Sequence, residues 1–134
     1  MHGLYLEDLK VGMWAMFGKT VTDADIMVFA GVSGDTNPIH VDEEFAKSVG
    51  LPGVILHGLY TMAQVARANS AAVGGDPRKL RRLSVQFRGM GFPEREITVT
   101  GTVKDERDGT VVVDTVAEQA GNQIIRNAEA ELQP

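Results

Sequence analysis

The stretch from Gly34 to His40 contains the residues best suited to chemistry. Asp35 and His40 are five residues apart, so a continuous helix would separate their side chains by about 140° around its axis. Pro38 prevents such a helix and biases Asn37 away from helical backbone angles. The stretch therefore predicts a tight loop. A carboxylate and an imidazole that converge in this loop form an acid–base pair, because histidine titrates near neutral pH.

A simpler interpretation of the same residues stays open on spacing alone. The sequence Asp-Thr-Asn-Pro is also a good turn, in which the Asp35 carboxylate bonds its own backbone and His40 is half-buried after it. Spacing narrows the site to these residues without deciding between a turn and a catalytic pair.

The segments before this loop must position it. Residues 13–21 predict a first strand. Thr22, followed three residues later by Asp25, is a capping-box pattern that begins a helix. Gly31 and Gly34 weaken that helix and are expected to end it.

A second short helix is predicted over residues 43–49, capped by Asp42 and stopped by Gly50. Glu43 and Glu44 then belong, with Asp42, to a solvated first turn, where negative charge suits the helix dipole. We expect this acidic group to be a cap rather than a set of metal ligands.

The longest helical candidate covers residues 57–73, with apolar side chains on nearly every face. A helix of this composition is expected to be buried. Four β-branched or alternating segments separated by turn signals follow it, at residues 83–88, 97–104, 110–118 and 123–132. This order predicts an α+β protein in which an antiparallel sheet wraps around one long central helix, the hotdog-type arrangement.

Composition narrows the classes of function. With 134 residues the chain fits one domain, residues 1–134, and a net charge of −5 argues against nucleic-acid binding. The absence of cysteine removes disulfides, thiolate metal sites and cysteine nucleophiles. Residues 1–8 lack the features of a signal peptide, and no stretch approaches the roughly 20 apolar residues of a membrane span. We expect a cytoplasmic protein without membrane contact.

The loop and the start of the long helix resemble the MaoC-like (R)-specific enoyl-CoA hydratase and 3-hydroxyacyl dehydratase family of hotdog proteins. The residues that match its hydratase motif are Phe29, Val32, Ser33, Gly34, Asp35, Asn37, Pro38, Ile39, His40 and Ala46. A second match is Ile55-Leu56-His57-Gly58-Leu59. Two departures are a non-standard turn after Gly91, and alanines at Ala63 and Ala66 where some relatives carry a serine facing the site.

The resemblance implies reversible hydration of a trans-2-enoyl thioester to an (R)-3-hydroxyacyl thioester, without a cofactor. Asp35 and His40 would hold one water between them and act as acid and base. Gly58 would offer its backbone N–H to the thioester oxygen, because the first N–H groups of a helix have no internal partner. The alternative for Gly58 is helix packing.

Further residues are predicted to face the substrate. They are Asn37 and Pro38 in the loop and His57 before the long helix. His57 can alternatively cap or pack against the helix, or act as a second base. The three histidines lack metal-ligand spacing, so no metal is expected.

The segment Arg78–Arg82 is basic in an acidic chain. Its arginines, Arg81 and Arg82 above all, are either a solvated strand entry or a binding site for the phosphates of coenzyme A or an acidic acyl carrier protein.

Two other classes of function compete with this one. A hotdog thioesterase would need a carboxylate on the long helix, and residues 59–73 contain none. A non-catalytic or partner-dependent acyl-thioester-binding subunit of a heteromeric dehydratase is the alternative, and the intact Asp35 and His40 pair argues against it. We also expect a homodimer, or a heterodimer with another hotdog subunit, because a single small sheet leaves an open edge.

Overall fold

The computed structural model describes residues 11, 12 and 14–133. Its strands are β1 (Trp14–Val21), β2 (Leu80–Phe87), β3 (Arg95–Arg107), β4 (Thr110–Gln119) and β5 (Asn122–Leu132). Its helices are α1 (Asp23–Ser33), α2 (Pro38–Val41), α3 (Glu43–Ser48), α4 (Gly58–Ala71) and the short 3-10 turn η2 (Pro77–Lys79). Residues 1–10 and residue 13 of the expected first strand lie outside this range, so the signal-peptide prediction is not addressed.

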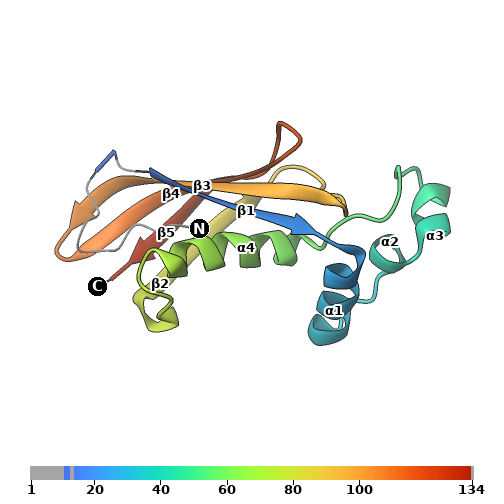
Figure 1. Ribbon diagram of the computed structural model, residues 1–134, viewed down its shortest axis with the longest axis horizontal. Coiled ribbons are helices and arrows are strands. Elements are labelled where there is room, and N and C mark those ends of the chain that lie inside the picture. The colour runs from blue at the N-terminus through green and yellow to red at the C-terminus, as the bar shows by residue number, and fades with distance from the viewer. Residues whose placement is uncertain (1–10, 13, 134) are drawn as a thin grey trace.

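The five strands form one antiparallel sheet in the order β1-β3-β4-β5-β2. Helix α4 lies along one face of this sheet (Figure 1), and Val65 of α4 is buried against a core that includes Val99, Ala117 and Ile125. The predicted α+β architecture, with a central helix on an antiparallel sheet, is confirmed.

A buried polar contact fixes α4 against the sheet. The Asn69 side chain donates to the Val65 carbonyl at 3.0 Å and to the Thr115 hydroxyl of β4 at 3.3 Å. Without this contact the buried Asn69 amide and Thr115 hydroxyl would each lack a hydrogen bond in a dry interior, which is costly. This contact therefore sets the position of the helix along the strand.

The hairpins follow the expected turn signals. Asp108 and Gly109 have φ angles of 50° and 78° between β3 and β4, and Ala120 and Gly121 have φ angles of 50° and 80° between β4 and β5. Two consecutive left-handed residues match the type I′ turn that suits the twist of paired strands.

Strand β2 begins three residues before the predicted start, at Leu80 instead of Leu83. Arg81 and Arg82 therefore lie inside the strand, where Arg82 pairs with Glu131 of β5. The start of β2 was hard to recognise from the sequence because its side chains are basic, and it becomes strand through pairing with the end of β5.

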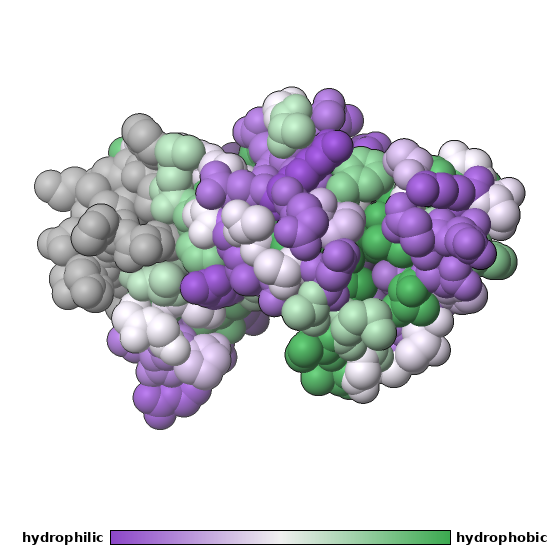
Figure 2. All heavy atoms as spheres, turned by 45° about the vertical axis from the view of Figure 1, so that its right-hand side comes forward, coloured by the Kyte–Doolittle hydropathy of each residue, from purple (hydrophilic) through white to green (hydrophobic). Residues whose placement is uncertain are grey.

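The composition of α4 predicted a buried helix, but the sheet covers only part of it in this chain. Leu59 is 60% exposed, and Ala63 and Arg67 on the same side of the helix are also exposed. Apolar side chains are exposed on α1 as well, where Val32 is 83% exposed. Figure 2 shows apolar patches among the polar side chains on the part of the surface that carries the helices.

Helices α1, α2 and α3 lie together beyond one end of the sheet (Figure 1). The capping box is confirmed: the Thr22 hydroxyl accepts from the Asp25 N–H, and the Asp25 carboxylate accepts from the Thr22 N–H. Helix α1 continues through Gly31 and ends at Gly34, which has a φ angle of 78°. Asp42 caps α3 by accepting from the Phe45 N–H, as predicted.

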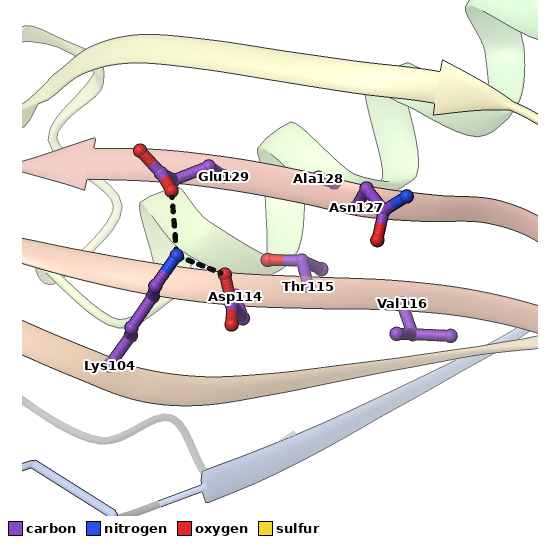
Figure 3. A pocket seen from close by; sticks show the side chains of 7 residues that line it. All are labelled: Lys104, Asp114, Thr115, Val116, Asn127, Ala128 and Glu129. Atoms are coloured by element: carbon purple, nitrogen blue, oxygen red, sulfur yellow. Dashed lines mark hydrogen bonds and ion pairs between the residues drawn. The ribbon is translucent and has the colours of Figure 1, made fainter.

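The far face of the sheet, opposite α4, carries a cross-strand ion cluster (Figure 3). Lys104 of β3 lies 3.2 Å from Glu129 of β5 and 3.7 Å from Asp114 of β4. The hydrogen bond to Glu129, followed by the charge of Asp114, raises the pKa of the Lys104 ammonium. These exposed groups join three strands and lie on the side of the sheet away from the helices.

In the part of the chain that the structure describes, no helix is both long enough and apolar enough to cross a membrane.

Candidate active site

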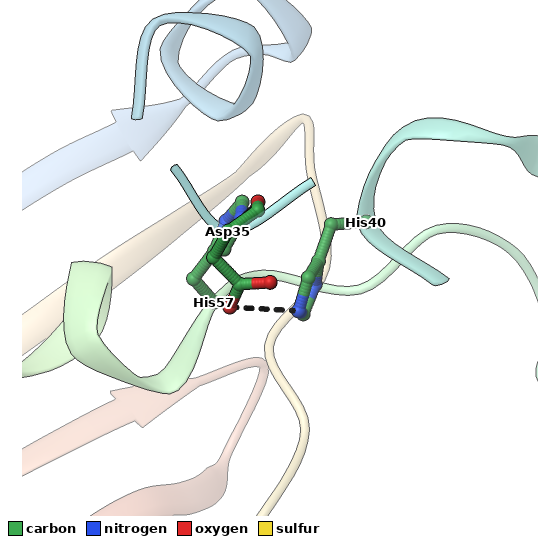
Figure 4. Close-up of side chains that lie close together, drawn as sticks. All are labelled: Asp35, His40 and His57. Atoms are coloured by element: carbon green, nitrogen blue, oxygen red, sulfur yellow. Dashed lines mark hydrogen bonds and ion pairs between the residues drawn. The ribbon is translucent and has the colours of Figure 1, made fainter. Parts of the chain in front are cut away.

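Asp35 follows the end of α1 and is held by its immediate neighbours. Its N–H donates to the Ser33 hydroxyl at 3.1 Å, and its Oδ1 accepts from the Asn37 N–H at 3.3 Å. The carboxylate thus forms the local turn that the simpler interpretation described. Its second oxygen, Oδ2, makes no such bond and points toward His40 (Figure 4).

His40 lies on α2, which is a correction to the predicted loop. Asn37 leaves helical angles as expected, but its side chain accepts from the Ile39 N–H and caps a single helical turn that begins at Pro38. A proline at the first helical position fits because its missing N–H is not needed there. This turn carries the His40 ring inward, where the residue is 8% exposed.

The contacts of the His40 ring show which of its nitrogens carries the proton. Nδ1 lies 2.8 Å from the Ile55 carbonyl oxygen, and because a carbonyl can only accept, Nδ1 is the donor. In the neutral ring Nε2 is then free of hydrogen. That atom lies 3.9 Å from Asp35 Oδ2, so a free base faces a free carboxylate oxygen.

The gap between these two atoms suits one water molecule. Hydrogen bonds of about 2.8 Å to each atom would span 3.9 Å with an angle near 90° at the water. The Asp35 side chain is 53% exposed, so this position can be reached from outside the protein.

His57 lies close to both members of the pair (Figure 4). Its Nε2 donates to the Asp35 carbonyl oxygen at 2.9 Å, and the residue is only 2% exposed. The ring stacks on His40 with centroids 3.9 Å apart and an angle of 24° between planes, and Phe29 packs against it at 4.9 Å. His57 occupies the N-cap position of α4 without making a side-chain cap. The substrate contact predicted for His57 stays a prediction.

Asp35, His40 and His57 also lie within 4.8 Å of one another through their ligand atoms. A metal site needs lone pairs that converge on one point. The two imidazoles are stacked in nearly parallel planes, so their lone pairs run side by side. This arrangement is a poor ligand set, and the expectation that no metal is used stays a prediction.

Gly58 begins α4 with a free donor. Among the described residues, none accepts a hydrogen bond from the N–H of Gly58 or of Leu59, and both residues are exposed. The Phe87 ring covers the glycine, since a Cβ atom placed there would lie 3.1 Å from Phe87 Cδ1. The start of α4 thus offers N–H groups that suit a developing negative charge.

The arginines predicted to face the substrate lie elsewhere in this chain. Arg81 donates to Gln133 at 3.0 Å, and Arg82 lies 3.5 Å from Glu131. Phe87, at the other end of β2, covers Gly58, so the arginines are about 16–20 Å along the strand from that glycine. Within one chain they are not part of the cluster around Asp35, and their role stays a prediction, as does substrate contact by Asn37 and Pro38.

The sequence of this chain matches one protein family over most of its length. The family model described as "MaoC like domain" matches residues 14–125. The chain belongs to this family. The (R)-specific enoyl-CoA hydratase of Rhodospirillum rubrum is 30% identical over 97% of this chain and 92% of its own length. The 3-hydroxybutyryl-CoA dehydratase of Methylorubrum extorquens is 41% identical over 63% of this chain and 54% of its own length.

Solved structures agree with the family assignment. The unliganded R-hydratase PhaJ1 from Pseudomonas aeruginosa has a TM-score of 0.88 and 25% identity, covering 98% of this chain and 85% of its own. The predicted hotdog fold and the predicted MaoC-like family are both confirmed.

Two contacts of the site could not be predicted from the sequence. The Ile55 carbonyl that holds His40 carries no side-chain signal, because any residue supplies a carbonyl. The Phe29 ring, which packs against His57 and also edge-on against Tyr60 at 5.7 Å, occupies the aromatic position of the family motif. The motif thus contains a packing residue beside its polar ones.

Proposed function

We propose that this chain is a hydro-lyase that reversibly adds water across the 2,3 double bond of a trans-2-enoyl thioester and forms an (R)-3-hydroxyacyl thioester. The observation that carries the proposal is the free Nε2 of His40 facing the free Oδ2 of Asp35 across 3.9 Å. The hydratase and dehydratase names of the two relatives agree with it.

The reaction proceeds on a water held between these atoms. His40 Nε2 accepts one proton as the water oxygen attacks C3, and Asp35 Oδ2 accepts a hydrogen bond from the other. The imidazolium, stabilised by the neighbouring carboxylate, then returns its proton to C2 on the same face. Hydroxyl and hydrogen are thereby added together, and the reverse steps eliminate water. Such positioned proton transfer contributes about 10²–10⁴-fold.

Gly58 can stabilise the negative charge that the reaction creates. Negative charge develops on the thioester oxygen when C3 is attacked, and the free N–H at the start of α4 can donate a hydrogen bond to that oxygen. An oxyanion contact of this kind is worth about 3 kcal/mol. Water is the sole co-reactant, so the proposed reaction uses no cofactor.

The carrier is coenzyme A or an acyl carrier protein, and the assembly is a dimer. Strands β1 and β2 are the edges of the sheet, and each has one side without a strand partner among the described residues. Leu59 and Val32 are exposed. A second hotdog subunit, identical or related, joined edge to edge would pair a free strand and cover apolar surface.

The test is turnover by the purified protein alone. Enoyl-CoA substrates of increasing chain length, and the same acyl groups on a carrier protein, should be hydrated to the (R)-3-hydroxy product. Complete inactivity over both series would refute the catalytic assignment and favour a non-catalytic, partner-dependent subunit.

A further inference from the structure

The hydrogen bond from His57 to the Asp35 carbonyl joins a buried ring to the backbone of the carboxylate that faces His40. The bond is 2.9 Å long and spans 22 residues of sequence. We propose that His57 is a positioning residue: its Nε2–H fixes the Asp35 peptide so that Oδ2 stays aimed at His40. The expected effect on kinetics rests on the proposed function, whereas the hydrogen bond does not depend on it.

The segment Ile55–His57 anchors both members of the pair. The Ile55 carbonyl holds His40 through Nδ1, and His57 holds Asp35 through Nε2. Ile55 also donates its own N–H to the Ile39 carbonyl at 3.1 Å. Because these bonds lie within three consecutive residues, the segment sets the separation of Asp35 and His40.

The two stacked rings must carry their protons on opposite nitrogens. Each ring faces a carbonyl acceptor, His40 through Nδ1 and His57 through Nε2, so each of these atoms bears the hydrogen. His57 Nδ1 is buried and has no partner among the described residues. The single donor of the neutral ring is therefore used on Asp35.

Packing offers another reason for a ring at this position, since His57 lies between His40 and Phe29. Hydrogen bonding and packing can be separated by three substitutions. His57→Gln keeps an N–H donor near the Nε2 position without a ring. His57→Phe keeps the ring without a donor, and His57→Met keeps neither.

We expect His57→Gln to retain kcat within about threefold of the wild type. His57→Phe and His57→Met should each lose at least about tenfold in kcat with little change in KM, because a displaced carboxylate harms the reacting geometry more than substrate binding. Thermal unfolding of all three variants shows whether each chain is folded. A loss in the Gln variant alone would contradict the proposal and assign the ring to packing. Equal losses in the Phe and Gln variants would also contradict it, because the donor alone would then not preserve activity.

The second readout does not depend on activity. Nitrogen NMR of ¹⁵N-histidine-labelled protein distinguishes the two neutral ring forms. In a His2→Gln background, which leaves His40 and His57 as the two histidines of the chain, we expect one ring protonated on Nδ1 and the other on Nε2, and His57→Phe should remove the Nε2–H signal. Loss of the Nδ1–H signal instead would overturn the proposed hydrogen bond. A wild type that hydrates no enoyl thioester would refute the proposed function, while this spectrum still decides the bond.

Discussion

The side chains of Asp35 and His40 each use one polar atom in a hydrogen bond to the backbone, and their remaining polar atoms face each other. Asp35 Oδ1 accepts from the Asn37 N–H and His40 Nδ1 donates to the Ile55 carbonyl, whereas Oδ2 and Nε2 lie 3.9 Å apart. Neither facing atom has another hydrogen-bond partner among the described residues. The pair is held in place without being neutralised by the protein, as a water-activating pair requires.

Asp35→Asn and His40→Gln should each lower kcat by at least about 10²-fold with crotonyl-CoA. Asparagine keeps the acceptor for the Asn37 N–H but removes the charge, and glutamine removes the ring base. Ser33→Ala, which removes only the hydroxyl that accepts from the Asp35 N–H, serves as a neighbouring control and should be far milder. A folded Asp35→Asn or His40→Gln protein with near wild-type kcat would remove that residue from the mechanism.

Gly58→Ala should lower activity without lowering the melting temperature. The added methyl group would lie beside the free N–H and 3.1 Å from Phe87 Cδ1, so we expect kcat/KM to fall about tenfold as the thioester oxygen is held away. Helix propensity improves by up to about 1 kcal/mol in the same variant.

The double variant Gly58→Ala/Phe87→Leu separates two causes of this loss. Leucine gives the methyl group room but leaves it beside the N–H, so activity should stay low. Recovery to the level of Phe87→Leu alone would show that displacement of the Phe87 ring, and not access to the N–H, was responsible.

Replacing Arg81 and Arg82 together by Gln should raise KM for acyl-CoA with little change in kcat. Contacts to a remote phosphate hold the ground and transition states equally. The effect should shrink with salt, since exposed charges are screened over about 8 Å at physiological ionic strength. Lys104→Gln/Arg107→Gln also removes two exposed positive charges and should leave KM unchanged. Equal damage with a pantetheine thioester, which lacks the nucleotide, would assign the arginines to the fold.

Tyr60 predicts a loss of stability in alkaline solution. Burial, reinforced by the negative charge of Asp25, raises the pKa of Tyr60 to about 12, above its value of about 10 in an unfolded chain. The contribution of neutral Tyr60 to the free energy of unfolding is fully present below pH ~10. It is lost as the pH rises toward ~12, because in this range the unfolded state releases the proton while the folded state keeps it. Denaturant unfolding at a series of pH values should show a shallower alkaline decline in Tyr60→Phe; parallel curves would contradict the assignment.

Local sequence signals predicted the ends of many elements correctly. Thr22 and Asp25 begin α1, Asp42 caps α3, and Asp108-Gly109 closes a hairpin, because capping and left-handed turns depend on neighbouring residues. The start of β2 was missed, since Arg81 and Arg82 become strand residues only through pairing with β5.

The candidate site shows the same difference between local signals and contacts between distant residues. Asp35 and His40 were recognisable through the family motif, yet spacing could not show that α2 would turn His40 inward. The His57 hydrogen bond joins positions 22 residues apart, and the exposure of Leu59 depends on what covers α4. Such long-range contacts leave no local pattern.

The residues that hold Asp35 and His40 lie close together in the sequence, and this affects how the sequences of related proteins can change. The hydrogen bonds that fix Asp35 and His40 all come from residues 33–57, and none comes from β2, β3, β4 or β5. Substitutions on those strands therefore leave the hydrogen bonds that set the acid–base geometry in place. The second half of the chain can then change in sequence without a compensating change in the first.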